Sequence, residues 1–238
     1  MSKPYISVII PAYNEEKLIT YCLKNLKNQN FNHPYEIIVV NGPSTDKTNT
    51  IAKNYAHTVV QQTGIGIGQA RQQGCQLAKG KILAITDADV FVPPNWLSKI
   101  YNYFLKHPRV IAITGPYEFV HSGNLNKASK IVRPIIKELH QFISDTVPLS
   151  GTNSAFKKSA YFKAGGFDPE ITGLEDVELG IRLSKIGQVV YLSSLVVKTT
   201  DRRFRQPGKH ILTTLLPTYI KRIVLKKKDK RVIWKPLK

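Results

Sequence analysis

The stretch Ile6-Ser7-Val8-Ile9-Ile10-Pro11-Ala12 decides the fold. It is apolar at almost every position, which predicts a strand buried on both faces, as in a parallel sheet. Polar residues, Tyr13-Asn14-Glu15-Glu16, follow it directly, and a helical pattern covers residues 15–29. A strand, a polar turn and a helix in this order form the first unit of a doubly wound α/β sheet.

The same unit recurs along the first half of the chain. We expect further strands at residues 35–40, 58–61 and 81–86, and helices at 45–55, capped by Ser44 or Thr45, and at 69–79. The second half is less regular, with expected strands at 110–114, 189–192 and 196–199 and helices at 125–143 and 174–186. The whole pattern predicts an α/β fold with a mostly parallel sheet flanked by helices. Ligands of such sheets bind beyond the carboxyl ends of the strands.

The composition limits the class of protein. The chain has 238 residues, of which 42% are hydrophobic and 21% charged, which is enough for a folded core. Cys22 and Cys75 lie far apart, so a disulfide-framed scaffold and a cysteine zinc site are excluded, and we expect both to pack in the core. We find no signal-peptide pattern and no run near the roughly 18–20 apolar residues of a spanning helix. These features predict a cytosolic protein.

Positive charge is concentrated near the C-terminus. The net charge is +19, and residues 202–238 hold 13 Lys and Arg against one acid, Asp229. Apolar side chains recur there in pairs every four residues, which predicts an amphipathic helix. They are Ile211, Leu212, Leu215, Leu216, Tyr219, Ile220, Ile223 and Val224. We expect a domain at residues 1–205 and a basic amphipathic tail at 206–238.

Three surroundings are conceivable for this tail: a membrane surface, the domain itself and nucleic acid. A basic amphipathic helix suits an anionic membrane surface, at about 1 kcal/mol per nearby basic side chain. Alternatively, the apolar stripe packs on the domain and the lysines are solvated. Nucleic acid is disfavoured, because aromatic side chains are not interleaved with the basic run. We favour the membrane, and we expect a cytoplasmic protein peripheral to the inner membrane face.

The sharpest chemical motif is Thr86-Asp87-Ala88-Asp89, directly after an expected strand. Two carboxylates in one turn can both reach a divalent cation, and hard oxygen ligands suit Mg²⁺ or Mn²⁺. A nucleotide diphosphate beside two carboxylates needs such a cation to offset the repulsion. Taken alone, the pair also fits an ordinary turn or helix cap.

A second acidic motif, Glu175-Asp176-Val177-Glu178, opens an expected helix. Acids in a first turn are favoured by the helix dipole, and Glu178 also stands four residues before Arg182. Asp176 follows the flexible Gly173 closely and is equally well placed to accept a proton from a hydroxyl group.

Two groups of arginines could bind phosphate. Arg71 follows the run Gly64-Ile65-Gly66-Ile67-Gly68 at an expected helix start, where a phosphate can approach. Arg71 occupies the position of the third glycine of a dinucleotide fingerprint, so a Rossmann cofactor site is rejected. Arg202, Arg203 and Arg205 carry forked guanidinium groups suited to phosphate, although a solvated basic loop explains that run equally simply.

Taken in order, these motifs resemble the family 2 glycosyltransferases of GT-A fold, inverting enzymes that use nucleotide-sugar donors. The resemblance covers roughly residues 5–195 and rests on five motifs together. They are Ser7 to Glu16, Val39 to Asp46, Thr86 to Asp89, Gly165-Gly166-Phe167-Asp168 and Glu175-Asp176.

The resemblance implies a role for each matched residue. The nucleotide-sugar site would consist of Pro11, Ala12, Tyr13, Glu15, Asn41, Arg71, Asp87, Arg202 and Arg203. Asp89 would be the main metal contact, with Asp87 sharing the metal or holding the ribose. Asp176 would be the catalytic base, with Glu175 and Gly166 on the acceptor side. It would deprotonate the acceptor hydroxyl as that oxygen attacks from the face opposite the diphosphate, which inverts the anomeric carbon.

Two departures from the family pattern matter. Asn41 stands where the family usually has an aspartate that contacts the base, and an amide can both donate and accept, so the nucleobase stays open. The QxxRW signature of polymerising members is missing, and residues 201–204 occupy that region. We therefore expect one sugar per encounter.

The sequence thus predicts an inverting, metal-dependent glycosyltransferase with a nucleotide-diphosphate sugar donor and a lipid-linked acceptor. One alternative is a soluble glycosyltransferase that acts on a sugar or protein hydroxyl. Another is a basic nucleic-acid-binding α/β protein, and a third is a non-catalytic relative that keeps the nucleotide pocket. The presence of Asp87, Asp89 and Asp176 argues against the third.

Overall fold

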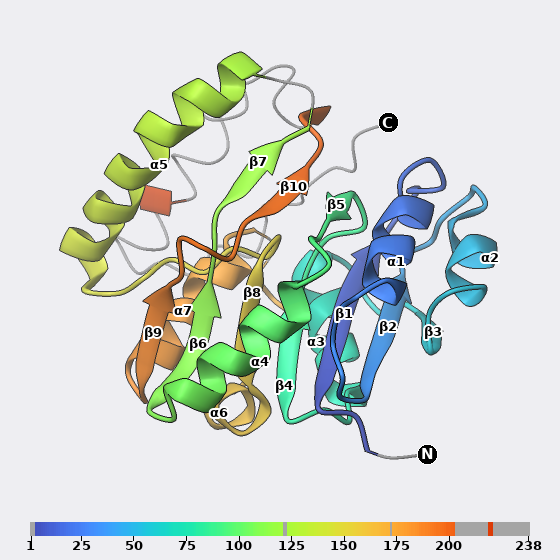
Figure 1. Cartoon of the computed structure of the whole chain (residues 1–238), viewed down its shortest axis with the longest axis horizontal. Coiled ribbons are helices and arrows are strands. Elements are labelled where there is room, and N and C mark those ends of the chain that lie inside the picture. The colour runs from blue at the N-terminus through green and yellow to red at the C-terminus, as the bar shows by residue number, and fades with distance from the viewer. Residues whose placement is uncertain (1–2, 121–122, 172, 203–218, 221–238) are drawn as a thin grey trace.

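The computed structural model describes residues 3–120, 123–171, 173–202 and 219–220 (Figure 1). Its centre is a seven-stranded sheet with the order β3-β2-β1-β4-β8-β6-β9. The strands are β1 (Ile6–Ala12), β2 (Tyr35–Asn41), β3 (Thr58–Gln61), β4 (Ile82–Ile85), β6 (Val110–Thr114), β8 (Ser154–Lys157) and β9 (Gln188–Tyr191). Strand β8 runs antiparallel to both of its neighbours, and the other pairs are parallel. The expected mostly parallel α/β sheet is confirmed.

A smaller sheet of three strands has the order β5-β10-β7. It consists of β5 (Val90–Phe91), β7 (Tyr117–Phe119) and β10 (Val197–Thr199). The helices are α1 (Ile19–Lys27), α2 (Thr48–Lys53), α3 (Ile67–Leu77), α4 (Trp96–Lys106), α5 (Gly123–Ser144), α6 (Lys158–Lys163) and α7 (Glu175–Ser184). Of these, α5 stands apart from the large sheet, beyond the small one (Figure 1).

The two faces of the large sheet bury separate cores. Helices α1 and α4 cover one face, and α3, α6 and α7 cover the other. Within β1, Val8 and Ile10 point into the first core and Ile9 into the second, and all three are fully buried. The uninterrupted apolar run therefore has the two-sided burial that it predicted. Cys22 and Cys75 are also buried, one in each core, as expected.

Two expected boundaries were wrong for a shared reason. Helix α1 begins at Ile19, because the N–H groups of Glu15 and Glu16 donate to the side chains of Thr48 (2.7 Å) and Asp46 (3.1 Å). Helix α2 begins at Thr48, and its first N–H donates to Asp46 (2.9 Å), so neither Ser44 nor Thr45 is its cap. The N–H groups of Thr45 and Lys47 donate to the side chains of Asn14 (2.9 Å) and Glu16 (3.0 Å), so residues of both turns bind the neighbouring turn instead of extending their own helices.

One helix of 11 residues, α4, and four short elements were not expected from the sequence. They are β5, α4, β7, β8 and α6. In the part of the chain that the structure describes, no helix is long and apolar enough to pass through a membrane. Of the predicted tail at 206–238, only Tyr219 and Ile220 are described, and Arg203 also lies outside the described residues. The division of the chain near residue 205 therefore stays a prediction.

Candidate active site

The turns after β1 and β2 are joined at the carboxyl ends of these strands. The N–H of Gly42 donates to the carbonyl of Ala12 (2.7 Å). The hydroxyl of Ser44 accepts the N–H of Asn14 (3.0 Å) and donates to the side chain of Asn41 (2.8 Å). The structure thus brings together the two turns that the sequence assigned to the nucleotide.

The residues that the sequence assigned to the nucleoside differ in burial. Pro11 is partly buried within β1. The ring of Tyr13 lies so close to Gly42 that a Cβ added to Gly42 would be 3.0 Å from it. Asn41 is 2% exposed, and its amide nitrogen donates to Gln61 (3.4 Å). Asn41 therefore lies beneath this surface with its amide already oriented by neighbouring side chains.

Asp87 is held by residues from two other segments. One carboxylate oxygen accepts from Arg71 Nη2 (2.8 Å), and the other accepts from the hydroxyl of Thr152 (3.0 Å). Arg71, on α3, pairs through Nη1 with Glu175 at the start of α7. This row of charges, Asp87–Arg71–Glu175, connects the turn after β4 with the first turn of α7.

Burial and pairing oppose each other within this row. Burial raises the pKa of Glu175, and the opposite charge of Arg71 acts against that shift. For Arg71, burial lowers the pKa, but Asp87, Glu175 and Asp176 outweigh it and the pKa is raised. Among the described residues, Arg71 Nε is the one buried side-chain nitrogen or oxygen without a hydrogen-bond partner.

Asp176 is held by a neighbouring loop. Its Oδ2 accepts the N–H of Gly151 (2.6 Å), and its Oδ1 accepts the N–H of Val177 (2.9 Å). Gly151 packs against the guanidinium of Arg71 so closely that a Cβ there would overlap it. Gly151 therefore contacts Asp176 and Arg71, and the next residue, Thr152, donates to Asp87. Two consecutive residues thus contact the expected base, the arginine and the expected donor-side carboxylate.

Asp89 has different partners. Its Oδ2 accepts from the hydroxyl of Thr200 (2.8 Å) and lies 3.4 Å from Arg202 Nη2. The same nitrogen lies 2.7 Å from both carboxylate oxygens of Glu15. Glu15 and Asp89 raise the pKa of Arg202 against the effect of burial. Arg202 is thus a partly exposed bridge between two of the expected site residues.

Gly166 lies in a packed turn. Its φ is +70°, and an added Cβ would meet Gln72 (2.6 Å) and the hydroxyl of Tyr161 (2.9 Å). The next N–H, of Phe167, donates to the same two side-chain oxygens (3.0 Å each). The structure therefore gives Gly166 a clear packing requirement, and its place on the acceptor side stays a prediction.

Three contributors were not identified from the sequence: Gly151, Thr152 and Thr200. The first two belong to the small polar run 150–153, which precedes the unexpected strand β8. Thr200 follows β10 directly, at the end of a strand that was expected. A search for polar residues after every expected strand would have found Thr200, whereas Gly151 and Thr152 precede a strand that was not expected.

Comparison with known proteins identifies a family. The family model described as Glycosyl transferase family 2 matches residues 7–163. The amylovoran biosynthesis glycosyltransferase AmsE of Erwinia amylovora is 23% identical over 231 residues, which cover 92% of this chain and 86% of AmsE. The glycosyltransferase MJ1057 of Methanocaldococcus jannaschii is 27% identical over 190 residues, or 76% of this chain. The chain spans 65% of MJ1057 and 30% of Bacillus subtilis EpsH, less than two thirds of each.

Solved structures show the same fold. The mannosyltransferase PcManGT of Pyrobaculum calidifontis, in complex with GDP-Man and Mn²⁺, has a TM-score of 0.70 at 22% identity, covering 99% of this chain and 68% of PcManGT. Residues 1–349 of Staphylococcus aureus TarS, in complex with UDP-GlcNAc, give a TM-score of 0.66 at 22% identity, covering 88% of this chain and 61% of TarS. The fold is therefore the GT-A fold that the sequence motifs implied.

Proposed function

Because the chain belongs to glycosyl transferase family 2, we propose that it is an inverting glycosyltransferase that moves one sugar from a nucleotide-diphosphate sugar to a lipid-linked acceptor. The observation that carries the proposal is the loop of Gly151 and Thr152. Gly151 donates its N–H to Asp176, and Thr152 donates its hydroxyl to Asp87. The same loop therefore positions a base for the acceptor and a carboxylate for the donor.

The donor would lie over the joined turns after β1 and β2, between Pro11, Ala12, Tyr13 and Asn41. PcManGT was solved with GDP-Man and TarS with UDP-GlcNAc, so the two neighbours carry different bases. Beyond its bonds to Gln61 and Ser44, the Asn41 amide keeps one further donor and one further acceptor position, which suits either base. We propose a nucleoside diphosphate sugar as the donor. Titration with UDP and with GDP identifies its base.

Asp89, together with Asp87, would hold a divalent cation such as Mg²⁺ or Mn²⁺. Carboxylate oxygens are the ligands that such cations prefer. The space between Asp89 and Glu15 already accommodates a positive group, the guanidinium of Arg202. The described residues contain no cluster of three or more His, Cys, Asp or Glu for a metal, so donor oxygens and water would complete the coordination. When bound, the cation would stabilise the charge of the leaving diphosphate.

Asp176 would act as the general base. Each of its oxygens accepts one backbone N–H, which fixes the carboxylate and leaves lone pairs for an incoming hydroxyl. The hydroxyl oxygen would form a bond to the anomeric carbon while its proton passes to Asp176 and the bond to the diphosphate breaks. With an acceptor that is already a phosphate, Asp176 would position the nucleophile instead.

The site would work at the cytosolic face of a membrane, with the basic tail at 206–238 contacting anionic lipid. The net charge of +19 supports this location. The alternative is a soluble glycosyltransferase that acts on a sugar or protein hydroxyl, with the tail packed on the domain. Sedimentation with anionic vesicles, with and without residues 209–238, distinguishes these alternatives.

The first test is calorimetric titration with UDP and with GDP, each with and without Mn²⁺. We expect one nucleotide to bind in a Mn²⁺-dependent manner and the Asp89→Asn variant to lose this dependence. Absence of binding by both nucleotides would contradict the donor site.

The second test addresses the base. With a hydroxyl acceptor, Asp176→Asn should retain nucleotide binding and lose turnover by about 10²-fold or more. Glu178→Gln is the matched control, because Glu178 lies on the same helix and pairs with Arg182 (2.6 Å). Undiminished transfer by Asp176→Asn would overturn the assignment of the base.

A further inference from the structure

Helix α5 carries a stripe of exposed apolar side chains. Its members are Ile135 (59% exposed), Ile136 (54%), Leu139 (54%), Phe142 (89%) and Ile143 (39%). At 100° per residue, these five positions fall within an arc of about 120° on one side of the helix. We call this set the α5 stripe.

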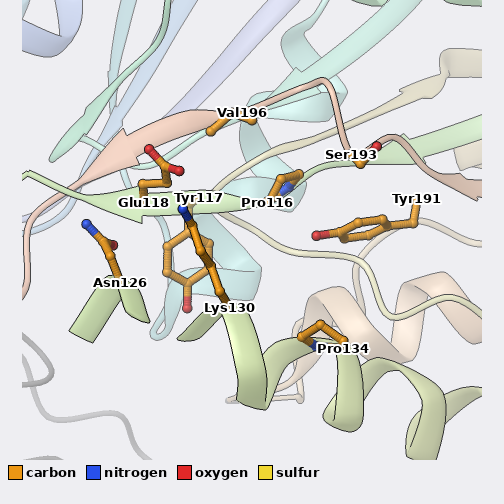
Figure 2. A pocket seen from close by; sticks show the side chains of 9 residues that line it. All are labelled: Pro116, Tyr117, Glu118, Asn126, Lys130, Pro134, Tyr191, Ser193 and Val196. Atoms are coloured by element: carbon orange, nitrogen blue, oxygen red, sulfur yellow. The ribbon is translucent and has the colours of Figure 1, made fainter. Parts of the chain in front are cut away.

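The opposite side of α5 is polar and faces the rest of the protein. The amide of Asn126 donates to the carbonyl of Phe119 (2.8 Å) and accepts its N–H (2.7 Å). Lys130 lines a cavity of about 260 Å³ between α5 and the small sheet (Figure 2). Lys137 places its ammonium group 5.2 Å from the centre of the Tyr191 ring.

His140 continues this polar side toward the C-terminal end of α5. It is 1% exposed, and its ring nitrogens bond the hydroxyls of Tyr219 (2.8 Å) and Thr146 (2.9 Å). In soluble proteins a helix turns its apolar side to the core and its polar side to water. Helix α5 has the reverse orientation, so its stripe needs a different partner from the core of its own domain.

We propose that the α5 stripe is a docking surface for an anionic lipid bilayer, into whose headgroup region its apolar side chains insert. The charge of the chain fits this partner, because a chain of net charge +19 is attracted to an anionic surface. Residues 123–144 contain four basic residues against one acid, Glu138, but Lys130 and Lys137 lie on the side that faces the protein, so the attraction comes from the chain as a whole. A helix with an exposed apolar side on such a chain lies in the plane of the interface, held by apolar burial and by this attraction.

A second copy of the chain fits the stripe less well. Two chains of net charge +19 repel each other, whereas an anionic surface attracts each of them. The stripe also runs over only about 12 Å of helix. Such a length offers much less than the roughly 800 Å² per partner of a standard protein interface.

The contact with Tyr219 joins helix α5 to the predicted tail. Tyr219 belongs to the apolar pattern expected at residues 211–224, and its bond to His140 places it on the side of α5 opposite the stripe. The proposal therefore rests on the α5 stripe and not on this contact. The docking surface goes beyond the proposed sugar transfer and does not depend on it.

Vesicle sedimentation of the full chain tests the proposal. We expect binding to vesicles of phosphatidylglycerol and phosphatidylcholine in equal parts, and weak binding to phosphatidylcholine alone. Phe142→Asp and Leu139→Asp should each lower the partition coefficient about tenfold, which corresponds to 1.4 kcal/mol. Leu105→Asp is the matched control, since Leu105 is a 62% exposed leucine on α4, and it should bind as the unmodified chain does.

Site-specific labelling gives a second readout that keeps the tail intact. The two native cysteines are buried (Cys22 1% and Cys75 0% exposed), so Phe142→Cys or Leu105→Cys would introduce one reactive thiol. An environment-sensitive fluorophore at position 142 should brighten and shift to the blue with anionic vesicles, and one at position 105 should not.

Three outcomes would overturn the proposal. They are the absence of vesicle binding by the full chain, equal binding by the Phe142→Asp variant together with an unchanged fluorophore at 142, and a dimer in solution that Phe142→Asp dissociates. The last would assign the stripe to a second copy. Calorimetric nucleotide binding by the same variants reports on the donor site separately, so a failure of the proposed function would be recognised independently.

Discussion

Two arginines bridge pairs of carboxylates in this molecule, and they differ in burial. Arg71 joins Asp87 to Glu175 with its side chain 4% exposed, whereas Arg202 joins Glu15 to Asp89 with its side chain 39% exposed. A buried charge that loses its partner cannot be hydrated, while an exposed one is hydrated and screened. The same chemical pattern therefore makes Arg71 a fixed part of the site and Arg202 a partner that another cation could replace.

The largest expected effect is the removal of the buried bridge. Arg71→Met leaves Asp87 and Glu175 without their counter-ion, so we expect the free energy of unfolding to fall by about 3–5 kcal/mol. Urea unfolding followed by circular dichroism measures this change. Arg182→Met is the control, because its pair with Glu178 is about one quarter exposed (25% and 27%) and should contribute about 1 kcal/mol or less. Equal losses of unfolding free energy in Arg71→Met and Arg182→Met would show that burial does not determine how much an ion pair stabilises this protein.

An intermediate effect is expected at Thr152, whose neutral hydroxyl donates to Asp87 in the row Asp87–Arg71–Glu175. Thr152→Val removes the hydroxyl that donates to Asp87 (3.0 Å) and preserves the shape of the side chain. A hydrogen bond to a charged group stabilises by about 1.5–3 kcal/mol, and we expect a loss in the lower part of that range. Thr152→Ser retains the hydroxyl and should recover most of the stability. Failure of serine to do so would show that the methyl group, not the hydrogen bond, matters.

A smaller effect is expected at the exposed bridge. Arg202→Met should lower the free energy of unfolding by less than about 1 kcal/mol, because solvent screens its pairs with Glu15 and Asp89. This difference should disappear at about 1 M salt, where the screening length is near 3 Å, whereas the effect of Arg71→Met should persist. Urea unfolding of both variants at low and high salt measures this difference in salt dependence. A loss of stability in Arg202→Met that does not change with salt would contradict it.

The smallest effect concerns a carboxylate held by neutral donors. Burial raises the pKa of Asp46, but hydrogen bonds from Thr48 and from the N–H of Glu16 together outweigh it, so the pKa is lowered below its ordinary value of 3.8. Its contribution to stability is therefore present above that value and is lost as the pH falls through the folded-state pKa. Asp46→Asn should flatten the acid side of the stability profile, and a profile unchanged below pH 3.8 would refute the assignment.

The first half of the fold could be predicted because its signals are local. The apolar run at 6–12 and the polar turn behind it lie within a few residues of each other, and β1, β2 and β3 formed where expected. The expected helix at 174–186 also formed, and it places Asp176 in the first turn of α7. The role of Asp176 as a base is still a prediction, because the position of a carboxylate does not establish what it does.

The arginine bridges could not be predicted, because their partners are distant in the sequence. Arg71 and Glu175 are 104 residues apart, and Arg202 and Glu15 are 187 apart. The sequence suggested phosphate for both arginines, and only the fold shows the carboxylates beside them. In the same way, periodicity predicted the helix that became α5 but not which of its sides faces solvent. That choice depends on tertiary packing.

Strand β8 has a consequence for how the chain is made. It lies between β4 and β6 and pairs with both, yet its first residue, Ser154, is synthesised long after Ile85 ends β4. Until then the ribosome carries a nascent chain with the far edge of β4 unpaired, and open strand edges readily pair with other chains. The gap between β4 and β6 is filled only once Lys157 has emerged, so β4 and β6 each keep an unpaired edge until late in synthesis.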